Sequence, residues 1–144
     1  MSDPVSNTRR QELVDAVGLE LEKISTGNNY STDFDRVTYW QDTPTEYNKN
    51  HLNFQDEEEK YQPENTQYDA ALEIYLRAIV IETATSRASK LGNLALNDLI
   101  KAVSDLCLEG ALIHLVDSRK WCETKGKTAC LIELQIKVLY HFER

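Results

Sequence analysis

The alternation of side chains over residues 129–142 constrains the fold more than any other feature of the sequence. Every even position in this run is apolar, and the odd positions include Glu133, Gln135, Lys137 and His141. The even side chains are Cys130, Ile132, Leu134, Ile136, Val138, Tyr140 and Phe142. A period of two places them all on one face of a β-strand. Because one strand cannot bury such a face, other strands must pair with it and other elements must cover it.

Further strands are predicted by similar patterns elsewhere. Residues 70–83 carry apolar side chains at the even positions from 70 to 80, with Glu73, Tyr75 and Arg77 opposite. Shorter runs predict strands at 36–41, 51–56 and 112–116. The turn residues at 124–127 lie between the last short strand and the long alternating run, so residues 112–141 are predicted to form a β-hairpin.

Two helices are predicted from apolar residues at helical spacing. The first spans 9–24, with Thr8 as N-cap and Gln11 three residues on, as in a capping box. Gly18 inside it would permit close packing on a sheet. The second spans 91–109, after a break in the pattern at 85–89, and Gly110 is placed to end it.

This order of elements predicts one α+β domain over residues 1–144, with a mostly antiparallel sheet and two helices packed on one face. We expect residues 1–7 to be flexible and 41–69 to form an extended acidic loop or hairpin. No apolar run approaches the ~20 residues that a membrane-spanning helix needs. The first residues lack the basic and apolar blocks of a signal peptide, so we expect a cytosol-like compartment.

Acidic residues are concentrated in residues 41–70. The net charge of the chain is −8, and this segment has a local balance of −6, from eight acidic residues against two lysines. The acidic residues are Asp42, Glu46, Asp56, Glu57, Glu58, Glu59, Glu64 and Asp69, and the lysines are Lys49 and Lys60. Phosphate binding needs clustered Lys and Arg, so the charge disfavours non-specific binding of nucleic acid.

The three cysteines show no CxxC spacing and indicate no metal or redox site. Cys107 and Cys130 fall on apolar faces, where a free cysteine behaves as a small hydrophobe. Cys122 and Cys130 flank the predicted hairpin turn, which leaves a disulfide between them as an alternative. A reducing compartment favours free thiols.

Signals of catalysis are weak. His51, His114 and His141 lack metal-ligand spacing, and no phosphate-binding glycine motif is present. Cys122 with a histidine is an alternative nucleophilic pair, but any chain with several Cys and His offers one. We therefore predict no catalytic residue, cofactor or metal. For the run 56–59, a solvated acidic loop is favoured over a metal site, with docking to a basic partner as a third interpretation.

Aromatic residues are frequent between positions 39 and 68. They are Tyr39, Trp40, Tyr47, Phe54, Tyr61 and Tyr68. Aromatic side chains among polar ones are common in protein–protein contacts. Packing beneath a long loop is the alternative explanation.

The sequence of elements resembles the tail terminator, or tail completion, proteins of long-tailed bacteriophages of the lambda type. The resemblance covers nearly the whole chain. It rests on the opening helix, the strand with an aromatic end and a Pro-containing segment at 37–44, the acidic stretch 53–59, the long strand at 68–76 and the closing hairpin. This chain has Thr43-Pro44-Thr45 where family members often have Leu-Pro-Ala.

The resemblance implies a non-enzymatic virion protein that forms a homo-oligomeric, usually hexameric, ring on the head-proximal end of the tail. Such a ring stops polymerisation of the tail tube and docks the head connector. Its partners are copies of itself, the tail tube protein and the head completion or connector protein. DNA passes through it without specific binding, no membrane is involved, and assembly takes place in the host cytoplasm.

Ring closure requires two different, complementary patches on each subunit. The acidic segment and the basic turn offer such halves. The candidate interface residues are Trp40, Tyr47, Asp56, Glu57, Glu58, Glu59, Lys120, Lys125 and Lys127. Alternatives are a head–tail connector or another tail completion factor or, from another class, a monomeric α+β binding module or small enzyme.

Overall fold

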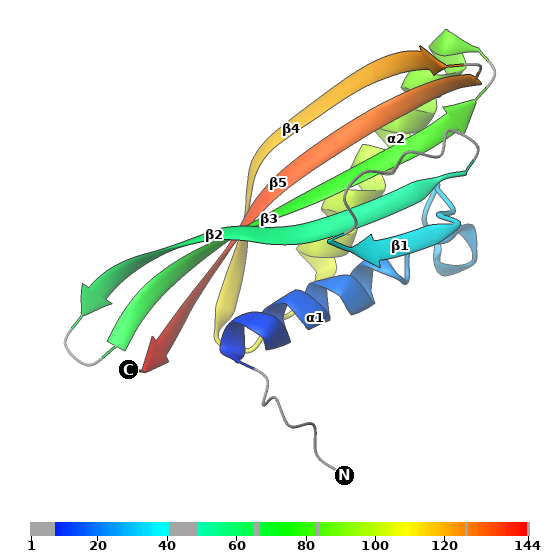
Figure 1. Cartoon of the computed structure of the whole chain (residues 1–144). Coiled ribbons are helices and arrows are strands. Elements are labelled where there is room, and N and C mark those ends of the chain that lie inside the picture. Colours follow the sequence, from blue (N-terminus) through cyan, green and yellow to red (C-terminus); the bar gives the residue numbers. More distant parts are fainter. Residues whose placement is uncertain (1–7, 41–48, 65–66, 83, 126, 144) are drawn as a thin grey trace.

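The alternating runs form a five-stranded sheet in the computed structural model, which describes residues 8–40, 49–64, 67–82, 84–125 and 127–143. Its elements in chain order are shown in Figure 1. They are α1 (Arg9–Leu21), a short 3-10 helix (Thr26–Asn28), β1 (Arg36–Tyr39), β2 (His51–Glu64), β3 (Gln67–Glu82), α2 (Thr85–Asp105), β4 (Ala111–Lys125) and β5 (Lys127–Glu143).

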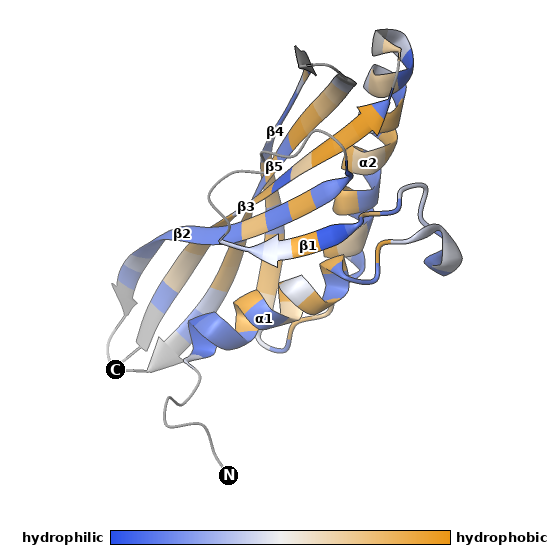
Figure 2. Ribbon diagram, turned by 45° about the vertical axis from the view of Figure 1, so that its right-hand side comes forward, coloured by the Kyte–Doolittle hydropathy of each residue, from blue (hydrophilic) through white to orange (hydrophobic). Residues whose placement is uncertain are grey.

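The strands lie in the order β1-β2-β3-β5-β4. All neighbours are antiparallel except β1 and β2, which are parallel. The even positions from 70 to 80 of β3 and from 130 to 140 of β5 are buried together with the apolar sides of α1 and α2 in one core. Hydrophobic and hydrophilic residues alternate along β2 and β3 in Figure 2. The predicted α+β fold, with a mostly antiparallel sheet covered by two helices, is confirmed.

Thr8 caps α1 as predicted, because its side-chain oxygen accepts a hydrogen bond from the backbone N–H of Gln11 at 3.1 Å. The Gln11 side chain donates instead to Asp15. The helix ends at Leu21, before the predicted end at residue 24. A Cβ on Gly18 would lie 2.6 Å from Cζ of Phe54, so the glycine does permit close packing of α1 on the sheet.

The apolar spacing predicts that the second helix starts at residue 91, which is wrong, since α2 begins at Thr85. Residues 85–89 interrupt the apolar pattern but form the first turn of the helix, in which the backbone N–H of Ala88 donates to the Ala84 carbonyl at 2.8 Å. Ala88 is buried in the core. Gly110 has φ +70° and serves the turn into β4 rather than the helix end at Asp105.

The hairpins are longer than the sequence pattern predicted. The acidic run 56–59 lies inside β2, which is one strand from His51 to Glu64 and pairs with β3. Of the two forms predicted for this segment, the hairpin is therefore present, and a loop at 56–59 is wrong. The strand predicted at 112–116 extends from Ala111 to Lys125 and carries an irregularity between Leu115 and Asp117. The hairpin of β4 and β5 is confirmed. The predictions for residues 1–7 and for residues 41–48 of the acidic segment lie outside the described residues.

The end of β2, the start of β3 and the end of β5 extend together past both helices (Figure 1). Among the described residues, no helix is long and apolar enough to span a membrane.

Candidate functional site

A β-bulge in β2 brings two carboxylates to the same face of the sheet. Asp56 lies opposite Ile74 of β3 and Glu59 opposite Leu72, so three steps along β2 match two steps along β3. The extra residue shifts the alternation by one position. Both side chains therefore lie on the face that the helices cover, although in a regular strand residues three apart point to opposite faces.

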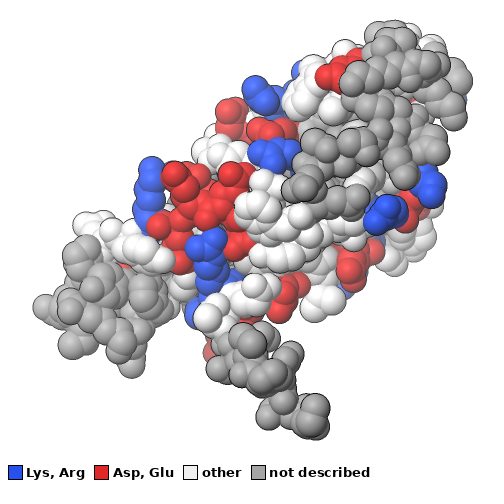
Figure 3. Space-filling view, viewed as in Figure 1, with Lys and Arg blue, Asp and Glu red and all other residues white. Residues whose placement is uncertain are grey.

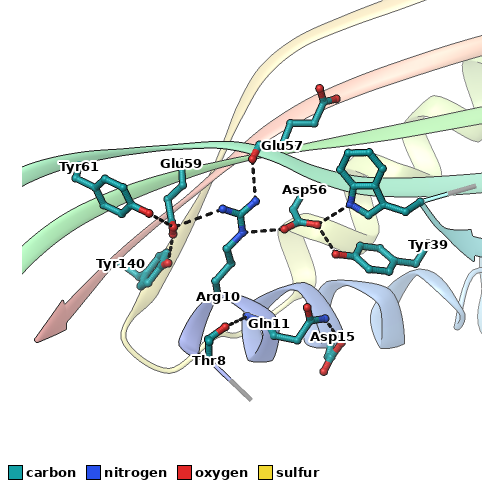
Figure 4. A network of polar contacts seen from close by, with 11 residues as sticks. Thr8, Arg10, Gln11, Asp15, Tyr39, Asp56, Glu57, Glu59, Tyr61 and Tyr140 are labelled. Carbon is teal, nitrogen blue, oxygen red and sulfur yellow. Dashed lines mark hydrogen bonds and ion pairs between the residues drawn. The ribbon is translucent and has the colours of Figure 1, made fainter. Parts of the chain in front are cut away.

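Arg10 of α1 binds both carboxylates (Figure 4). Its Nε lies 2.8 Å from an Asp56 oxygen, and a second nitrogen donates to the Glu57 carbonyl at 2.8 Å. A third contact joins the guanidinium to Glu59 at 3.6 Å. Both carboxylates are largely buried, while the Arg10 side chain is one third exposed. Such pairing compensates for removing the acidic groups from water.

Hydroxyl and indole groups also donate to these two carboxylates. Asp56 accepts from the Tyr39 hydroxyl and from the Trp40 indole at 2.9 Å. Glu59 accepts from the Tyr61 hydroxyl at 2.6 Å and from the Tyr140 hydroxyl. The network thus joins α1, the end of β1, β2 and β5. We call these residues the Arg10 network: Arg10, Tyr39, Trp40, Asp56, Glu57, Glu59, Tyr61 and Tyr140.

The hydrogen bonds of the network keep Asp56 ionised. Burial alone would raise the pKa of Asp56, but the hydrogen bonds from Tyr39, Trp40 and Arg10 outweigh it and lower that pKa below its ordinary value of 3.8. Burial raises the pKa of Tyr39 to about 12, and the hydrogen bond to Asp56 adds to this effect. Tyr39 is therefore a neutral donor and Asp56 a charged acceptor at neutral pH.

Trp40 has an unusual backbone conformation for a bulky residue, with φ +54°. Its backbone N–H donates to the Phe54 carbonyl at 3.0 Å, and its indole N–H is held by Asp56. Half of the side chain remains exposed. The network thus fixes a partly exposed indole at a strained position, which is typical of functional sites.

The acidic candidate residues divide into internal and exposed groups. Asp56 and Glu59 were predicted on an exposed acidic loop, but they are bound inside the Arg10 network. Glu57 contacts Arg77 at 3.6 Å on the opposite face of the sheet. Glu58 is exposed. Acidic residues gather over the middle of β2 in Figure 3, beside basic residues.

The basic candidate residues lie on the other hairpin. Lys120 is exposed, and its Nζ contacts Ser89 Oγ and Asn93 Oδ1 of α2, both at 2.8 Å. Lys125 ends β4 and Lys127 begins β5, but their side chains lie outside the described residues, as does Tyr47 altogether. The structure therefore does not bring Lys120 and the acidic run together within one subunit.

Charged residues also cross the face of the sheet opposite the helices. Glu133 of β5 lies 2.7 Å from Arg77 of β3 and 3.8 Å from Arg119 of β4. Together with the contact of Arg77 to Glu57, these pairs form a row of alternating charge over four strands.

The sequence pattern did not single out Arg10. It placed Tyr140 on the apolar face, which is confirmed, but did not indicate that the Tyr140 hydroxyl donates to Glu59. The sequence feature that could have indicated the network is a change in the alternation along β2. Leu52 and Phe54 occupy the helix-covered face at even positions, whereas Tyr61 occupies the same face at an odd position. Two carboxylates bound by a guanidinium and hydroxyl groups suit a structural junction more than metal binding or proton transfer. In the described part of the chain, no cluster of His, Cys, Asp and Glu could hold a metal ion.

Comparison with models of protein families and with curated proteins finds no match to this chain.

Proposed function

We propose that this protein is a non-enzymatic virion component that caps the tail tube of a long-tailed bacteriophage. Copies of the chain form a closed ring, a hexamer as the resemblance implies, at the head-proximal end of the tail. The ring ends polymerisation of the tube and provides the docking surface for the head connector. It assembles in the host cytoplasm and needs no cofactor.

The observation that carries the assembly part of the proposal is the open edge of β4. Among the described residues, β5 is the strand partner of β4, and the other edge of β4 has none. Three large aliphatic side chains of β4 are exposed: Leu112 by 65%, Leu115 by 50% and Val116 by 44%. A hollow of about 470 Å³ adjoins Leu112. Long edges with exposed apolar side chains favour pairing with another chain.

The arrangement of elements supports the identity of the assembly. The chain follows the order implied by the resemblance: an opening helix, a short strand, a long hairpin, a second helix and a closing hairpin. The strands that extend past the helices offer surface at a distance from the core, where a neighbouring subunit or the tube can be contacted (Figure 1).

The charge of the protein supports the passage of DNA without binding. The chain has a net charge of −8, and a ring lined by acidic residues would repel phosphate. We propose no base-specific or phosphate contact.

The interface proposed between subunits is heterologous, with one patch meeting a different patch of the neighbour. Because Asp56 and Glu59 are bound internally, its acidic half rests on Glu58, the exposed part of Glu57 and the indole of Trp40. Lys120, Lys125 and Lys127 form the basic half. The Arg10 network then acts as the support that fixes Trp40 in this patch.

Electron microscopy of particles made without this protein tests the function directly. We expect tail tubes of abnormal and variable length, because nothing ends their growth. Tailless heads beside tails of normal length would instead indicate a head–tail joining factor. Normal, joined particles would contradict both roles.

Charge reversal tests the interface. We expect the double variant Lys125→Glu/Lys127→Glu to lose self-association at low salt, as measured by size-exclusion chromatography with light scattering. The matched control is Lys23→Glu/Lys101→Glu, which changes the net charge equally at two exposed lysines, one just past the end of α1 and one on α2. Equal self-association of the two double variants would contradict the assignment of the basic half. A wild-type chain that stays monomeric even with tail tubes present would favour the monomeric binding module or small enzyme.

A further inference from the structure

Cys122 and Cys130 lie directly opposite one another across β4 and β5. Residues in such a pair point to the same face of the sheet, with Cα atoms about 4.5 to 5.5 Å apart. This separation falls within the range that a disulfide spans without movement of the backbone. The two thiols therefore need only side-chain rotation to meet.

The surroundings of the two thiols differ. Cys130 is fully buried beneath α2, where a Cβ on Gly92 would lie only 2.3 Å from its sulfur. Cys122 sits on the edge strand and is exposed. Lys120, two residues before it, binds Ser89 and Asn93 of α2, which fixes the start of the helix over this end of the hairpin. One thiol thus meets solvent while its partner is held in place behind it.

Burial raises the pKa of the Cys130 thiol to about 12, and a hydrogen bond with Cys122 contributes in the same direction. Cys130 is therefore a protonated thiol at neutral pH, and its attack on another sulfur requires loss of that proton. The exposed Cys122 is the sulfur that a reagent reaches first.

We propose that Cys122 and Cys130 form a site of reversible oxidation by low-molecular-weight disulfides. The Cys122 thiolate attacks one sulfur of the small disulfide, forming a mixed disulfide and releasing one small thiolate. Cys130 then gives its proton to solvent and attacks the Cys122 sulfur, which releases the second small thiolate. The two protein thiols are oxidised to one disulfide, and the small disulfide is reduced to two thiols. A small thiol reverses both steps.

The disulfide would tie the open edge strand to β5 beside the first turns of α2. This site does not depend on the proposed role in a phage tail, because it requires only the hairpin and the helix above it.

The experiment incubates the full-length protein with oxidised glutathione, quenches it with acid, and measures the intact mass and the peptide map without reduction. We expect a monomer whose mass has fallen by two hydrogen atoms, with one peptide pair linked through Cys122 and Cys130. The control Cys107→Ser is expected to form the same bridge. Cys122→Ser is expected to form none, and Cys122 lies on the surface, so the fold should be retained.

A second measurement follows the order of the steps. In Cys130→Ala we expect the glutathione adduct to accumulate at Cys122, whereas in the wild type this adduct decays to the bridge, faster as the pH rises. Glutathione adducts that persist on wild-type Cys122, or a bridge that involves Cys107, would overturn the proposal. So would equal alkylation rates of Cys122 and Cys130 in the folded protein.

Discussion

Arg10 holds two buried carboxylates of β2 against α1, and its guanidinium is itself partly in water. Its contacts are charge-assisted hydrogen bonds, which contribute more to stability than neutral ones. Removing it would leave Asp56 and Glu59 in the interior without their cation. The tyrosine hydroxyls and the indole would remain as donors and limit the loss.

We expect Arg10→Gln to lower the free energy of unfolding by about 2 kcal/mol, in the range measured for hydrogen bonds to charged groups. The control is Arg87→Gln, since Arg87 is 74% exposed and contacts Glu82 at 3.5 Å. Surface changes of that kind stay within about 0.5 kcal/mol. Urea denaturation followed by circular dichroism measures both. Equal losses of unfolding free energy in the two variants would show that the Arg10 network does not stabilise the fold.

The stability that Asp56 provides should depend on pH. The folded pKa of this group lies below its ordinary value of 3.8. Its contribution is therefore fully present above that value and is lost as the pH falls through the folded pKa. We expect the difference in unfolding free energy between wild type and Asp56→Asn to be constant near neutral pH and to shrink below pH 3.8. A difference that grew on acidification would contradict the predicted sign.

The bulge in β2 determines what the acidic run does. Without it, Asp56 and Glu59 would point to opposite faces and could not share Arg10. With it, the helix-side pattern continues from Leu52 and Phe54 to Glu59 and Tyr61, opposite the regular pattern of β3. The two residues between Asp56 and Glu59 face a single residue of β3, so one of them is dispensable for register.

Deletion of Glu58 should therefore be tolerated. It converts the bulge into a regular ladder and leaves Asp56 and Glu59 on the same face. We expect the variant to fold, with a loss of about 1 kcal/mol from the changed contact between Arg10 and the Glu57 carbonyl. Deletion of Tyr75 in the regular part of β3 is the comparison. That deletion turns the side chains on one side of it to the wrong face, and the cooperative unfolding transition should disappear. Thermal melts distinguish the two, and loss of the transition in both would contradict the register.

The whole molecule has an asymmetric surface. One face of the sheet is covered by the helices, the other carries charged pairs, and the β4 edge is open and partly apolar. In a monomer the apolar side chains of this edge remain exposed to water. A ring of identical subunits can bury the edge against a different surface of each neighbour.

We expect the triple variant Leu112→Thr/Leu115→Thr/Val116→Thr to keep the fold and to lose self-association. Threonine preserves strand propensity, and these side chains are exposed, so each change should alter the unfolding free energy by no more than about 0.5 kcal/mol. Sedimentation velocity at several protein concentrations measures the assembly. The control is Leu19→Thr, at a side chain 63% exposed on α1. A triple variant that assembles like the control would show that the β4 edge is not an interface.

Local pattern alone determined the fold class of this protein. Period-two alternation in β3 and β5 and helical spacing in α1 and α2 report which faces must be buried, and burial dominates the choice of architecture. The N-cap at Thr8 and the close approach at Gly18 were also predicted, because both depend on residues near in sequence or on the size of one side chain.

Tertiary structure decided the features that depend on distant partners. The strand through residues 56–59 is stable because Arg10 compensates acidic side chains that pattern alone assigns to a loop. The first turn of α2 forms because Ala88 packs in the core, despite the polar residues around it. The sequence left a pairing of Cys122 and Cys130 as an alternative, and the register of the hairpin places them opposite one another. The contacts of Arg10 and of Ala88 could not be read from sequence spacing, since their free energy comes from groups that only the fold brings together.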